Sequence, residues 1–564
     1  MTNPVFETKQ KLLSLVSEAI QQAIAAGELP ACETLPEFVV EIPADTTHGD
    51  FATNAAMTGA RAFKSAPRKI AEAICKHLTL DGTDFERVEI AGPGFINFFL
   101  GKKWFAEVVQ SVLNAGTDYG RTDYGKGEKV QIEFVSANPT GPMHMGNARG
   151  GAIGDCLASA MDWAGYQVTR EFYVNDAGNQ IEKFGCSLEA RYLQIFRGED
   201  AVAFPEDGYH GDDIRQRAQE FAELHGESYL EVDSASRRQA LVDYALPRNI
   251  EKLKADLESY RIFYDVWFLE SQLHHGAIDA AIQRLSERGM TYEKEGALWY
   301  KATENGGEKD EVLIRANGFP TYFAADIAYH YNKFAVRGFE RVINVWGADH
   351  HGHVARLKGA MDAIGLDGSK LDIILMQLVR LMKDGQPYKM SKRTGKAVSL
   401  TDLIEDVPVD AARFFFNMRE PNSTFDFDLD LAVEQTAQNP VYYVQYAYAR
   451  ICSILRKLEQ EQVLARCCSC GELCQLCGPD EQQLIRCLAR FPQEIVDAAR
   501  CYDPARLTKY AVELATAFHR LYTTCRIKGE IEPLMQARLN LCIATKTVLC
   551  NVLTLLKINV LESM

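Results

Sequence analysis

Hydrophobic positions in the first part of the chain follow helical spacing in one segment and strand-like patterns in others. Residues 9–25 carry apolar side chains three and four positions apart, which predicts an amphipathic helix. Residues 38–42 and 88–90 read as short strands, and Gly92-Pro93-Gly94 predicts a turn after the second of them. Together these elements predict a separate mixed module of helices and strands over residues 1–115.

Strand and helix patterns alternate from about residue 125 to about residue 430. Such alternation predicts a parallel, doubly wound (Rossmann-like) sheet that binds ligands at the carboxyl ends of its strands. We assign the sheet to a central domain over residues 116–431. Residues 187–275 are charged, largely helical and without clusters of catalytic residue types, so we interpret them as an insertion in that domain. The patterned segments are strands 130–135, 168–174, 342–346 and 371–376 and helices after Asn147 and over 354–363.

Strand signals disappear after residue 431. Helical periodicity recurs over residues 441–460, 481–500, 507–527 and 535–560, which predicts an all-helical bundle over residues 432–564. The expected fold class is therefore multidomain α/β. It combines a Rossmann-like central domain with an N-terminal α+β domain and a C-terminal all-α bundle.

The composition is that of a globular protein. A chain of 564 residues with 47% hydrophobic residues is long enough for about three to four domains. Its net charge of −16 argues against bulk attraction to nucleic acid, whereas a specific RNA partner needs only a local basic stripe. No uninterrupted apolar run reaches membrane-spanning length, and the charged first twenty residues are unlike a secretion signal. We expect a cytoplasmic protein.

The 15 cysteines are expected to be reduced thiols, because the chain is long and lacks a secretion signal. Five of them gather at Cys467, Cys468, Cys470, Cys474 and Cys477, where two Cys-x-x-Cys pairs are separated by three residues. That gap is shorter than zinc ribbons use. We expect a cysteine-rich exposed loop without metal, and a zinc site is the alternative.

Two motifs about 240 residues apart together predict a cradle for ATP. His144-Met145-Gly146-Asn147 lies between a strand pattern and a helix pattern, so it begins a helix whose unpaired N–H groups favour anions. Lys389-Met390-Ser391-Lys392-Arg393 follows a hairpin signal, which places cations on a loop that can close over phosphates. Alone, the histidine would more often be structural and the lysines a solvated surface. The chain has no Gly-x-x-x-x-Gly-Lys phosphate loop and no complete dinucleotide fingerprint.

These motifs resemble the two signatures of class I aminoacyl-tRNA synthetases, and other blocks are similar to the arginyl-tRNA synthetases of bacteria. The likeness extends from the first hundred residues to Met564. Its blocks are Glu133-Phe134-Val135-Ser136-Ala137-Asn138-Pro139-Thr140-Gly141-Pro142, Tyr173-Val174-Asn175-Asp176-Ala177-Gly178-Asn179-Gln180, Pro320-Thr321-Tyr322, Gly347-Ala348-Asp349-His350-His351-Gly352-His353 and Val444-Gln445-Tyr446-Ala447-Tyr448-Ala449-Arg450.

The resemblance implies an ATP-dependent ligase that joins L-arginine to tRNA(Arg). Such an enzyme forms arginyl-adenylate and releases pyrophosphate, then transfers the arginyl group to the terminal adenosine of the tRNA and releases AMP. Mg²⁺ is expected with ATP, held mainly by phosphate oxygens. We expect a monomer that has no membrane contact.

The resemblance also assigns residues to ATP, whose α-phosphate needs cations and N–H donors during adenylate formation. His144 is expected to donate to the phosphates, and Gly146 to admit the adenosine where a Cβ would clash. Asn147 stands where family members often carry a second histidine, and its amide donates a hydrogen bond but cannot become cationic. His144, Asn147, Lys389 and Lys392 are the expected catalytic residues, and further ATP contacts are expected from Asp349, His350, His353, Met390 and Ser391. The histidine spacing in the Asp349–His353 block does not complete a zinc site.

A guanidinium substrate needs carboxylates with planar, bidentate geometry. By position, Glu133 and Asn138 match the family's contacts near the backbone end of the amino acid, and Tyr322 and Asp326 match those at the guanidinium. Tyr322 and Asp326 are four residues apart, which on a helix puts both side chains on one face. Each acid could instead be an ordinary surface acid or a helix cap.

Two further pairs match contacts with tRNA. Phe95 and Asn97 correspond to the N-terminal domain's contact with the tRNA elbow, although they could be a core aromatic and a surface amide. Tyr446 and Arg450 lie in the helical domain that binds the anticodon in the family, where such side chains stack on unpaired bases. The rival interpretations are another class I synthetase, or an RNA-binding paralogue that has lost catalysis.

Overall fold

A four-stranded antiparallel sheet and three helices form the N-terminal domain in the computed structural model, which describes residues 2–32, 34–388 and 398–564. The strand order is β1-β2-β4-β3. The first helix begins before the predicted residue 9 because Asn3 caps it and Pro4 occupies its first turn. The predicted strand 38–42 is shorter than expected. The elements are α1 (Pro4–Ala25), β1 (Val40–Glu41), β2 (Phe51–Thr53), α2 (Ala55–Thr58), α3 (Pro67–His77), β3 (Phe85–Ala91) and β4 (Phe95–Leu100).

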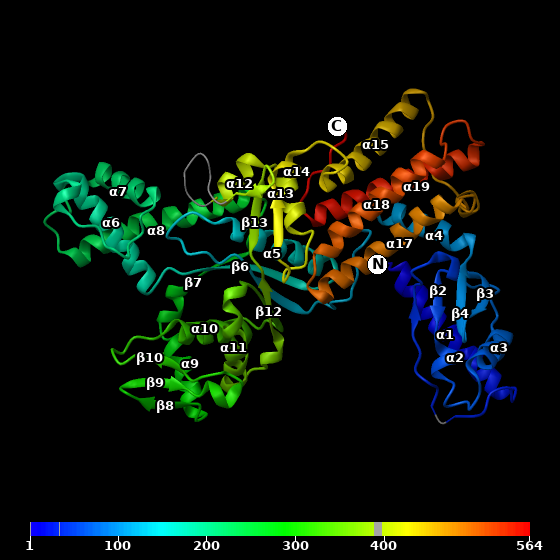
Figure 1. Ribbon diagram of the computed structural model, residues 1–564, viewed down its shortest axis with the longest axis horizontal. Coiled ribbons are helices and arrows are strands. Elements are labelled where there is room, and N and C mark those ends of the chain that lie inside the picture. The colour runs from blue at the N-terminus through cyan, green and yellow to red at the C-terminus, as the bar shows by residue number, and fades with distance from the viewer. Residues whose placement is uncertain (1, 33, 389–397) are drawn as a thin grey trace.

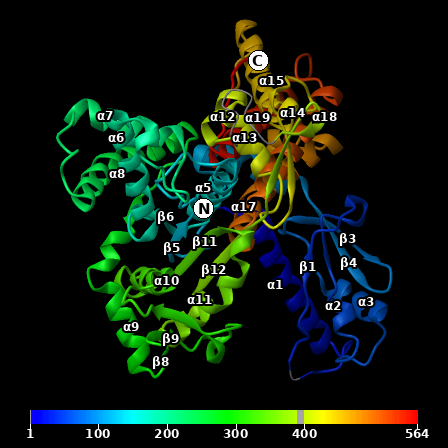
Figure 2. The ribbon, with the colours of Figure 1, turned by 60° about the vertical axis from the view of Figure 1, so that its left-hand side comes forward.

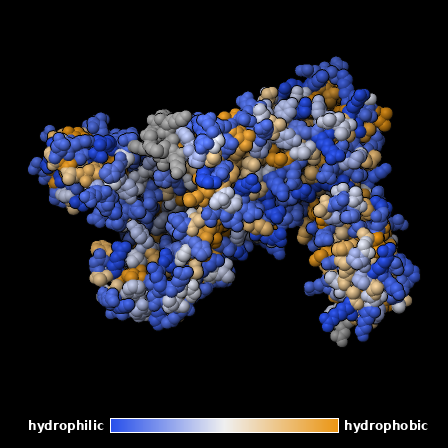
Figure 3. All heavy atoms as spheres, in the orientation of Figure 1, coloured by the Kyte–Doolittle hydropathy of each residue, from blue (hydrophilic) through white to orange (hydrophobic). Residues whose placement is uncertain are grey.

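Helix α4 (Lys102–Ala115) connects this domain to the rest of the chain and packs against the C-terminal helices α16, α17 and α19. Arg486 of α17 also pairs with Asp50 of the N-terminal domain. Figure 3 shows an open notch between the N-terminal domain and the lobe that contains α9–α11. The N-terminal domain therefore joins the molecule near one end only.

Five parallel strands in the order β12-β11-β5-β6-β7 confirm the predicted doubly wound sheet. The chain runs outward from β5 to β7 on one side and from β11 to β12 on the other, so the order reverses between β5 and β11. Ligands bind at such switch points, beyond the carboxyl ends of the strands. The elements are β5 (Lys129–Glu133), α5 (Met145–Trp163), β6 (Gln167–Val174), β7 (Val266–Leu269), α10 (Tyr322–Tyr331), β11 (Arg341–Gly347), α11 (His351–Ile364) and β12 (Leu371–Met376).

Three helices form a separate lobe at one end of the molecule, on the left in Figure 1. They are α6 (Asn179–Arg197), α7 (Asp212–His225) and α8 (Ser234–Ser259), and they share a core that includes Phe184, Leu188 and Phe221. Strand β7 lies within the range 187–275 that the sequence assigned to an insertion, yet it pairs in parallel with β6. That assignment is wrong for β7, because four consecutive apolar residues after a long helix gave no alternation to identify them as a strand.

Two small sheets flank the central one. The antiparallel sheet β10-β9-β8 lies in the lobe of α9, and β13 joins β14 on one side and β15 on the other. The predicted hairpin before the lysine-rich motif is confirmed, with Asp384 and Gly385 at φ values of 52° and 70° in its turn. The elements are α9 (Ala277–Glu287), β8 (Thr291–Lys294), β9 (Ala297–Tyr300), β10 (Glu311–Ile314), β13 (Val379–Lys383), β14 (Gln386–Pro387), α12 (Leu400–Asp406), α13 (Val409–Phe416), β15 (Phe425–Asp428) and α14 (Leu429–Val433).

The C-terminal bundle contains the four predicted helices and one extra short helix. Helix α17 packs along both α5 and α4, and α5 and α17 lie side by side in Figure 2. Phe491 of α17 contacts the rings of Trp163 and Tyr119 at this junction. Among the described residues, no helix is both long enough and apolar enough to cross a membrane. The helices are α15 (Pro440–Gln460), α16 (Cys470–Leu473), α17 (Pro479–Cys501), α18 (Ala505–Thr524) and α19 (Glu532–Leu555).

The cysteine-rich segment differs from the exposed loop that its sequence predicted. Cys468 is 9% exposed, and its sulfur accepts a hydrogen bond from Asn540 at 3.3 Å. Cys470 and Cys474 are half-buried at α16, which packs against α4 and α19. Only Cys467 and Cys477 of the five are exposed. The segment is therefore part of the packing between the bundle and α4.

We expect serine at Cys467 and Cys477 together to change the free energy of unfolding by less than about 0.5 kcal/mol, because both side chains are exposed. Serine at Cys468 will lower the free energy of unfolding by about 1–3 kcal/mol, because it places a hydroxyl where a thiol is buried. Thermal unfolding of the three proteins measures both effects. Elemental analysis should find well under one zinc per chain, and stoichiometric zinc with unfolding on chelation would contradict the prediction.

Candidate active site

The first motif begins α5 directly beyond the carboxyl end of β5. His144 is the N-cap residue, and its backbone N–H donates to Oδ1 of Asn147 at 2.9 Å. Since Asn147 uses this oxygen to cap the helix, only its Nδ2 amide group can donate a hydrogen bond to a phosphate. His144 and Gly146 are exposed, and a Cβ built on Gly146 meets no protein atom within 4 Å. The helix start is thus open to a ligand.

The second motif falls on residues 389–397, so Lys389, Met390, Ser391 and Lys392 lie outside the described residues. Beyond that segment, the N–H of Leu400 donates to the Met143 carbonyl at 2.9 Å, and the N–H of Met145 donates to Val398 at 3.3 Å. These hydrogen bonds hold the chain that follows the second motif against the first motif. The described residues that follow the second motif, Val398 and Leu400, therefore lie beside the first motif.

Two carboxylates and two tyrosines converge at the carboxyl ends of β6 and β7. Asp326 lies on α10 and is one-third exposed, whereas Glu270 directly follows β7 and is 3% exposed. The Tyr173 hydroxyl hydrogen-bonds to Glu270, and Tyr322 lies close enough for Glu270 to act on its pKa. Burial raises the pKa of Glu270 and the negative charge of Asp326 adds to the rise, while hydrogen bonds from Tyr173 and His274 oppose it. Such a group of acceptors suits a cation that offers several N–H donors.

His353 belongs to this acidic group in the structure. Its Nε2 lies 2.9 Å from Oδ2 of Asp326, and its Nδ1 accepts a hydrogen bond from Nε of Arg356 at 2.8 Å. Because Nδ1 is an acceptor, the proton sits on Nε2, and the neutral imidazole donates to Asp326. Asp349 and His350 are exposed and line a neighbouring cavity of about 260 Å³.

The residues expected at the backbone end of the amino acid are held by protein partners. Asn138 donates to Oε1 of Gln180 at 3.2 Å, and the Gln180 backbone contacts the Tyr322 hydroxyl. Glu133 is 7% exposed and accepts from Lys333 at 2.6 Å and from the Ser136 hydroxyl at 2.9 Å. A carboxylate has about four acceptor positions, so Glu133 retains capacity for a ligand.

The two pairs expected to contact tRNA lie outside this pocket. On β4 of the N-terminal domain, Phe95 is half-buried and Asn97 is 4% exposed. On α15, the Arg450 guanidinium lies over the ring of Tyr446 at 5.2 Å. A cavity of about 370 Å³ adjoins this pair and is also lined by basic side chains of α15 and by the last residues of the chain.

Glu270 is the site residue that the sequence analysis missed. It occupies the position directly after a strand of the doubly wound sheet, which is where that fold presents its ligand contacts. Recognising 266–269 as a strand would have identified it. The interpretation of residues 187–275 as an insertion prevented residues 266–269 from being recognised as a strand.

Family models match three consecutive parts of the chain. They are described as "Arginyl tRNA synthetase N terminal domain" over residues 10–100, "tRNA synthetases class I (R), catalytic domain" over 108–451 and "DALR anticodon binding domain" over 444–564. These matches confirm the resemblance seen in the sequence.

Full-length relatives agree with the family models. The chain is 56% identical to an arginine–tRNA ligase of Caldanaerobacter subterraneus and 53% identical to one of Acetivibrio thermocellus, with complete coverage of both chains in each comparison. The structure of Thermus thermophilus arginyl-tRNA synthetase shares the fold, with a TM-score of 0.72, 23% identity and coverage of 97% of this chain and 99% of the other. The chain belongs to the arginyl-tRNA synthetases, a family of class I aminoacyl-tRNA synthetases.

Proposed function

We infer that this chain is an arginine–tRNA ligase that attaches L-arginine to tRNA(Arg) at the expense of ATP. Arginine and ATP form arginyl-adenylate and pyrophosphate, and the arginyl group then passes to the tRNA with release of AMP. Family membership over the whole chain supports this reaction. In the structure, the observation that supports this reaction most is the convergence of Asp326 and Glu270 beyond the carboxyl end of β7.

For the amino acid, we assign Asp326 and Glu270 to the guanidinium. This group offers five N–H donors and no acceptor, so two carboxylates can accept from its two edges. The Tyr322 and Tyr173 rings bound the same space. Glu133 and Asn138 are assigned to the α-amino and carboxylate end, because Glu133 is the last residue of β5 and Asn138 lies between it and His144 in the chain.

For ATP, we assign the phosphates to His144, Asn147, Lys389 and Lys392, and the nucleoside to the surface around Gly146. The unpaired N–H groups and the dipole at the start of α5 favour the phosphates. Contacts from Asp349, His350, His353, Met390 and Ser391 complete the proposed ATP site. Among the described residues, no group of three or more His, Cys, Asp or Glu side chains could hold a metal ion. Mg²⁺ is proposed to arrive bound to the phosphate oxygens of ATP.

For tRNA, we assign the anticodon to α15, where Tyr446 and Arg450 form a stacking surface, and the elbow to the N-terminal domain around Phe95. Asn97 is too buried to reach RNA without a rearrangement of β4, so its proposed contact is weaker than that of Phe95. We also propose that the enzyme acts as a cytoplasmic monomer.

An ATP–pyrophosphate exchange assay tests the assignment. Purified protein is supplied with total tRNA and each amino acid in turn. We expect exchange when the amino acid is arginine and no exchange with any other amino acid. Exchange that requires another amino acid would identify a different class I synthetase. No exchange with any amino acid would identify a paralogue without catalysis.

The raised pKa of Glu270 predicts how arginine recognition depends on pH. As pH falls, Glu270 takes up a proton at a higher pH than an ordinary carboxyl group does, and its O–H then faces a cation that offers only donors. The KM for arginine will therefore rise as pH falls from about 8 to about 5.5, with its steepest change above the usual carboxyl pKa. Glu270→Gln should have a higher KM for arginine at pH 8 than the wild type. Its KM for arginine should also lack the part of the rise at low pH that protonation of Glu270 causes. The KM for ATP over the same range is the control.

A further inference from the structure

A layer of buried polar side chains separates α10 from the central sheet. A helix that covers a parallel sheet usually buries an apolar face. Here the sheet presents Gln131 and Glu133 from β5, Glu171 from β6 and Asn344 from β11, and the helical side presents Tyr329, His330 and Lys333, together with Arg337, whose side chain is 23% exposed. Glu171, Lys333 and Asn344 are fully buried. A buried ion pair often adds little to the free energy of unfolding. It is better known for fixing one arrangement of the helices and strands that carry its two charges.

Lys333 is the centre of this layer. Its ammonium donates to Oε2 of Glu133 at 2.6 Å and to Oδ1 of Asn344 at 3.0 Å, so it joins the ends of β5 and β11. The same Asn344 amide contacts Nε2 of His330 at 2.8 Å, and Nδ1 of His330 contacts the backbone carbonyl of Asp326 at 2.8 Å. A continuous set of hydrogen bonds thus runs from the sheet to the residue assigned to the guanidinium.

Lys333 lies in a π-helical turn through which the chain leaves α10. This turn spans Asn332–Val336, and the N–H of Arg337 closes it on the Asn332 carbonyl at 2.9 Å. Lys333 and Arg337 are four residues apart and both reach the sheet, where Arg337 pairs with Glu171 on β6. Single π-helical turns of this kind are frequent at functional sites.

Glu133 is also held from its other side. The Ser136 hydroxyl donates to Oε1 of Glu133 at 2.9 Å and accepts the N–H of Tyr173 at 3.1 Å. Val135 and Ser136 have φ values of 70° and 42°, which is an unfavourable conformation for residues other than glycine, above all for β-branched valine. The strained turn leads directly to Asn138. Its shape therefore depends on a Glu133 carboxylate that Lys333 orients.

We propose that Lys333 is a positioning residue for arginine recognition. By joining β5, β11 and the π-helical turn, its ammonium sets where α10 presents Tyr322 and Asp326, and it orients Glu133 for the other end of the amino acid. The proposal rests on the arginine pocket assigned above. Lys333 itself touches no substrate in this scheme.

Lys333→Met tests the proposal, because methionine fills the same space without the ammonium. We expect the KM for arginine to rise on the order of tenfold, with kcat within about twofold and the KM for ATP unchanged. A purely structural role would lower the fraction of active enzyme and the melting temperature but leave the KM for arginine unchanged. Active-site titration and thermal unfolding report those two quantities.

Asn344→Leu provides a second variant that keeps the Lys333–Glu133 pair, so no buried charge is left alone. It removes the links to β11 and His330, and the KM for arginine should rise again while the KM for ATP does not. This variant decides the question if Lys333→Met fails to fold.

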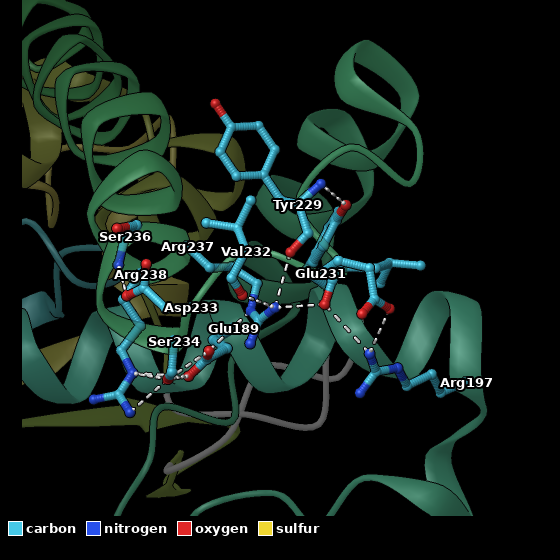
Figure 4. Close-up of polar contacts among 12 residues, drawn as sticks. Glu189, Arg197, Tyr229, Glu231, Val232, Asp233, Ser234, Ser236, Arg237 and Arg238 are labelled. Atoms are coloured by element: carbon cyan, nitrogen blue, oxygen red, sulfur yellow. Dashed lines mark hydrogen bonds and ion pairs between the residues drawn. The ribbon is translucent and has the colours of Figure 1, made fainter.

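Arg237→Met is the matched control. Arg237 is 8% exposed and donates to Glu189 at 2.9 Å in the helical lobe of α6–α8, where Ser234 and Arg238 bind the same carboxylate (Figure 4). It should lower the melting temperature without changing the KM for arginine.

Unchanged KM for arginine in both Lys333→Met and Asn344→Leu, or a parallel rise in the KM for ATP, would overturn the positioning role. If the assignment of the arginine pocket is wrong, the experiments give a different result. In that case the wild type would not exchange with arginine, or Asp326→Asn would leave its KM unaltered.

Discussion

Asp326→Asn will raise the KM for arginine about 30- to 700-fold, which corresponds to about 2–4 kcal/mol of lost binding free energy. The asparagine amide replaces one acceptor oxygen with a donor, and that donor faces either the guanidinium or the Nε2–H of His353. Either orientation leaves two donors opposed. The KM for ATP and the rate at saturating arginine should change much less, because Asp326 binds the part of the substrate that does not react.

Steady-state ATP–pyrophosphate exchange with varied arginine measures this effect. Asp279→Asn is a suitable control, because Asp279 is an exposed aspartate at the start of α9 in the same lobe. It should alter the KM for arginine by less than about twofold. If Asp326→Asn instead lowers only the maximal rate, Asp326 contacts the reacting groups and the guanidinium assignment is wrong.

Lys392→Ala will lower the rate of adenylate formation about 100- to 1,000-fold at saturating substrates, the cost of removing one donor from a charged transition state. Negative charge grows on the α-phosphate and pyrophosphate oxygens as they separate, and the lysine ammonium opposes it there. The KM for arginine should change little, since the lysine acts mainly in the transition state. The hydrogen bonds between Val398–Leu400 and Met143–Met145 support the placement of this motif beside ATP.

Lys383→Ala provides the matching control. Lys383 belongs to the hairpin strand β13 that leads toward the same motif, and its ammonium lies 5.5 Å from the centre of the Tyr388 ring. Its loss should change the exchange rate by less than about twofold, because a single cation–π contact between half-buried side chains is weak. Near-normal exchange in Lys392→Ala, measured beside this control, would remove Lys392 from the mechanism.

Much of the architecture could be predicted from local patterns. The helices of the bundle and the strands β6, β11 and β12 follow hydrophobic periodicity, which depends only on which face of an element is buried. Strand β7 could not be predicted in this way. It is four residues long and fully apolar, so only its pairing with β6 identifies it as part of the sheet.

Some residues of the candidate site could also be placed from the sequence, whereas others depend on the tertiary structure. Tyr322 and Asp326 share a helix face, and His144 begins a helix, so sequence spacing alone could place each of them. Asn97 shows the opposite case, because its burial on β4 requires strands on both sides, and one of them, β2, pairs with it through Ala52, which is distant in sequence.

The sequence by itself determined the family and the alternation of strands and helices, and it predicted the residue types around ATP, because motifs and periodicity are local properties of the chain. Only the tertiary structure decided that Glu270 joins Asp326, that His353 donates to Asp326, and that Lys333 holds Glu133. These contacts join residues 27 to 200 positions apart. Their energy depends on distance and burial in the folded molecule, neither of which spacing along the chain specifies.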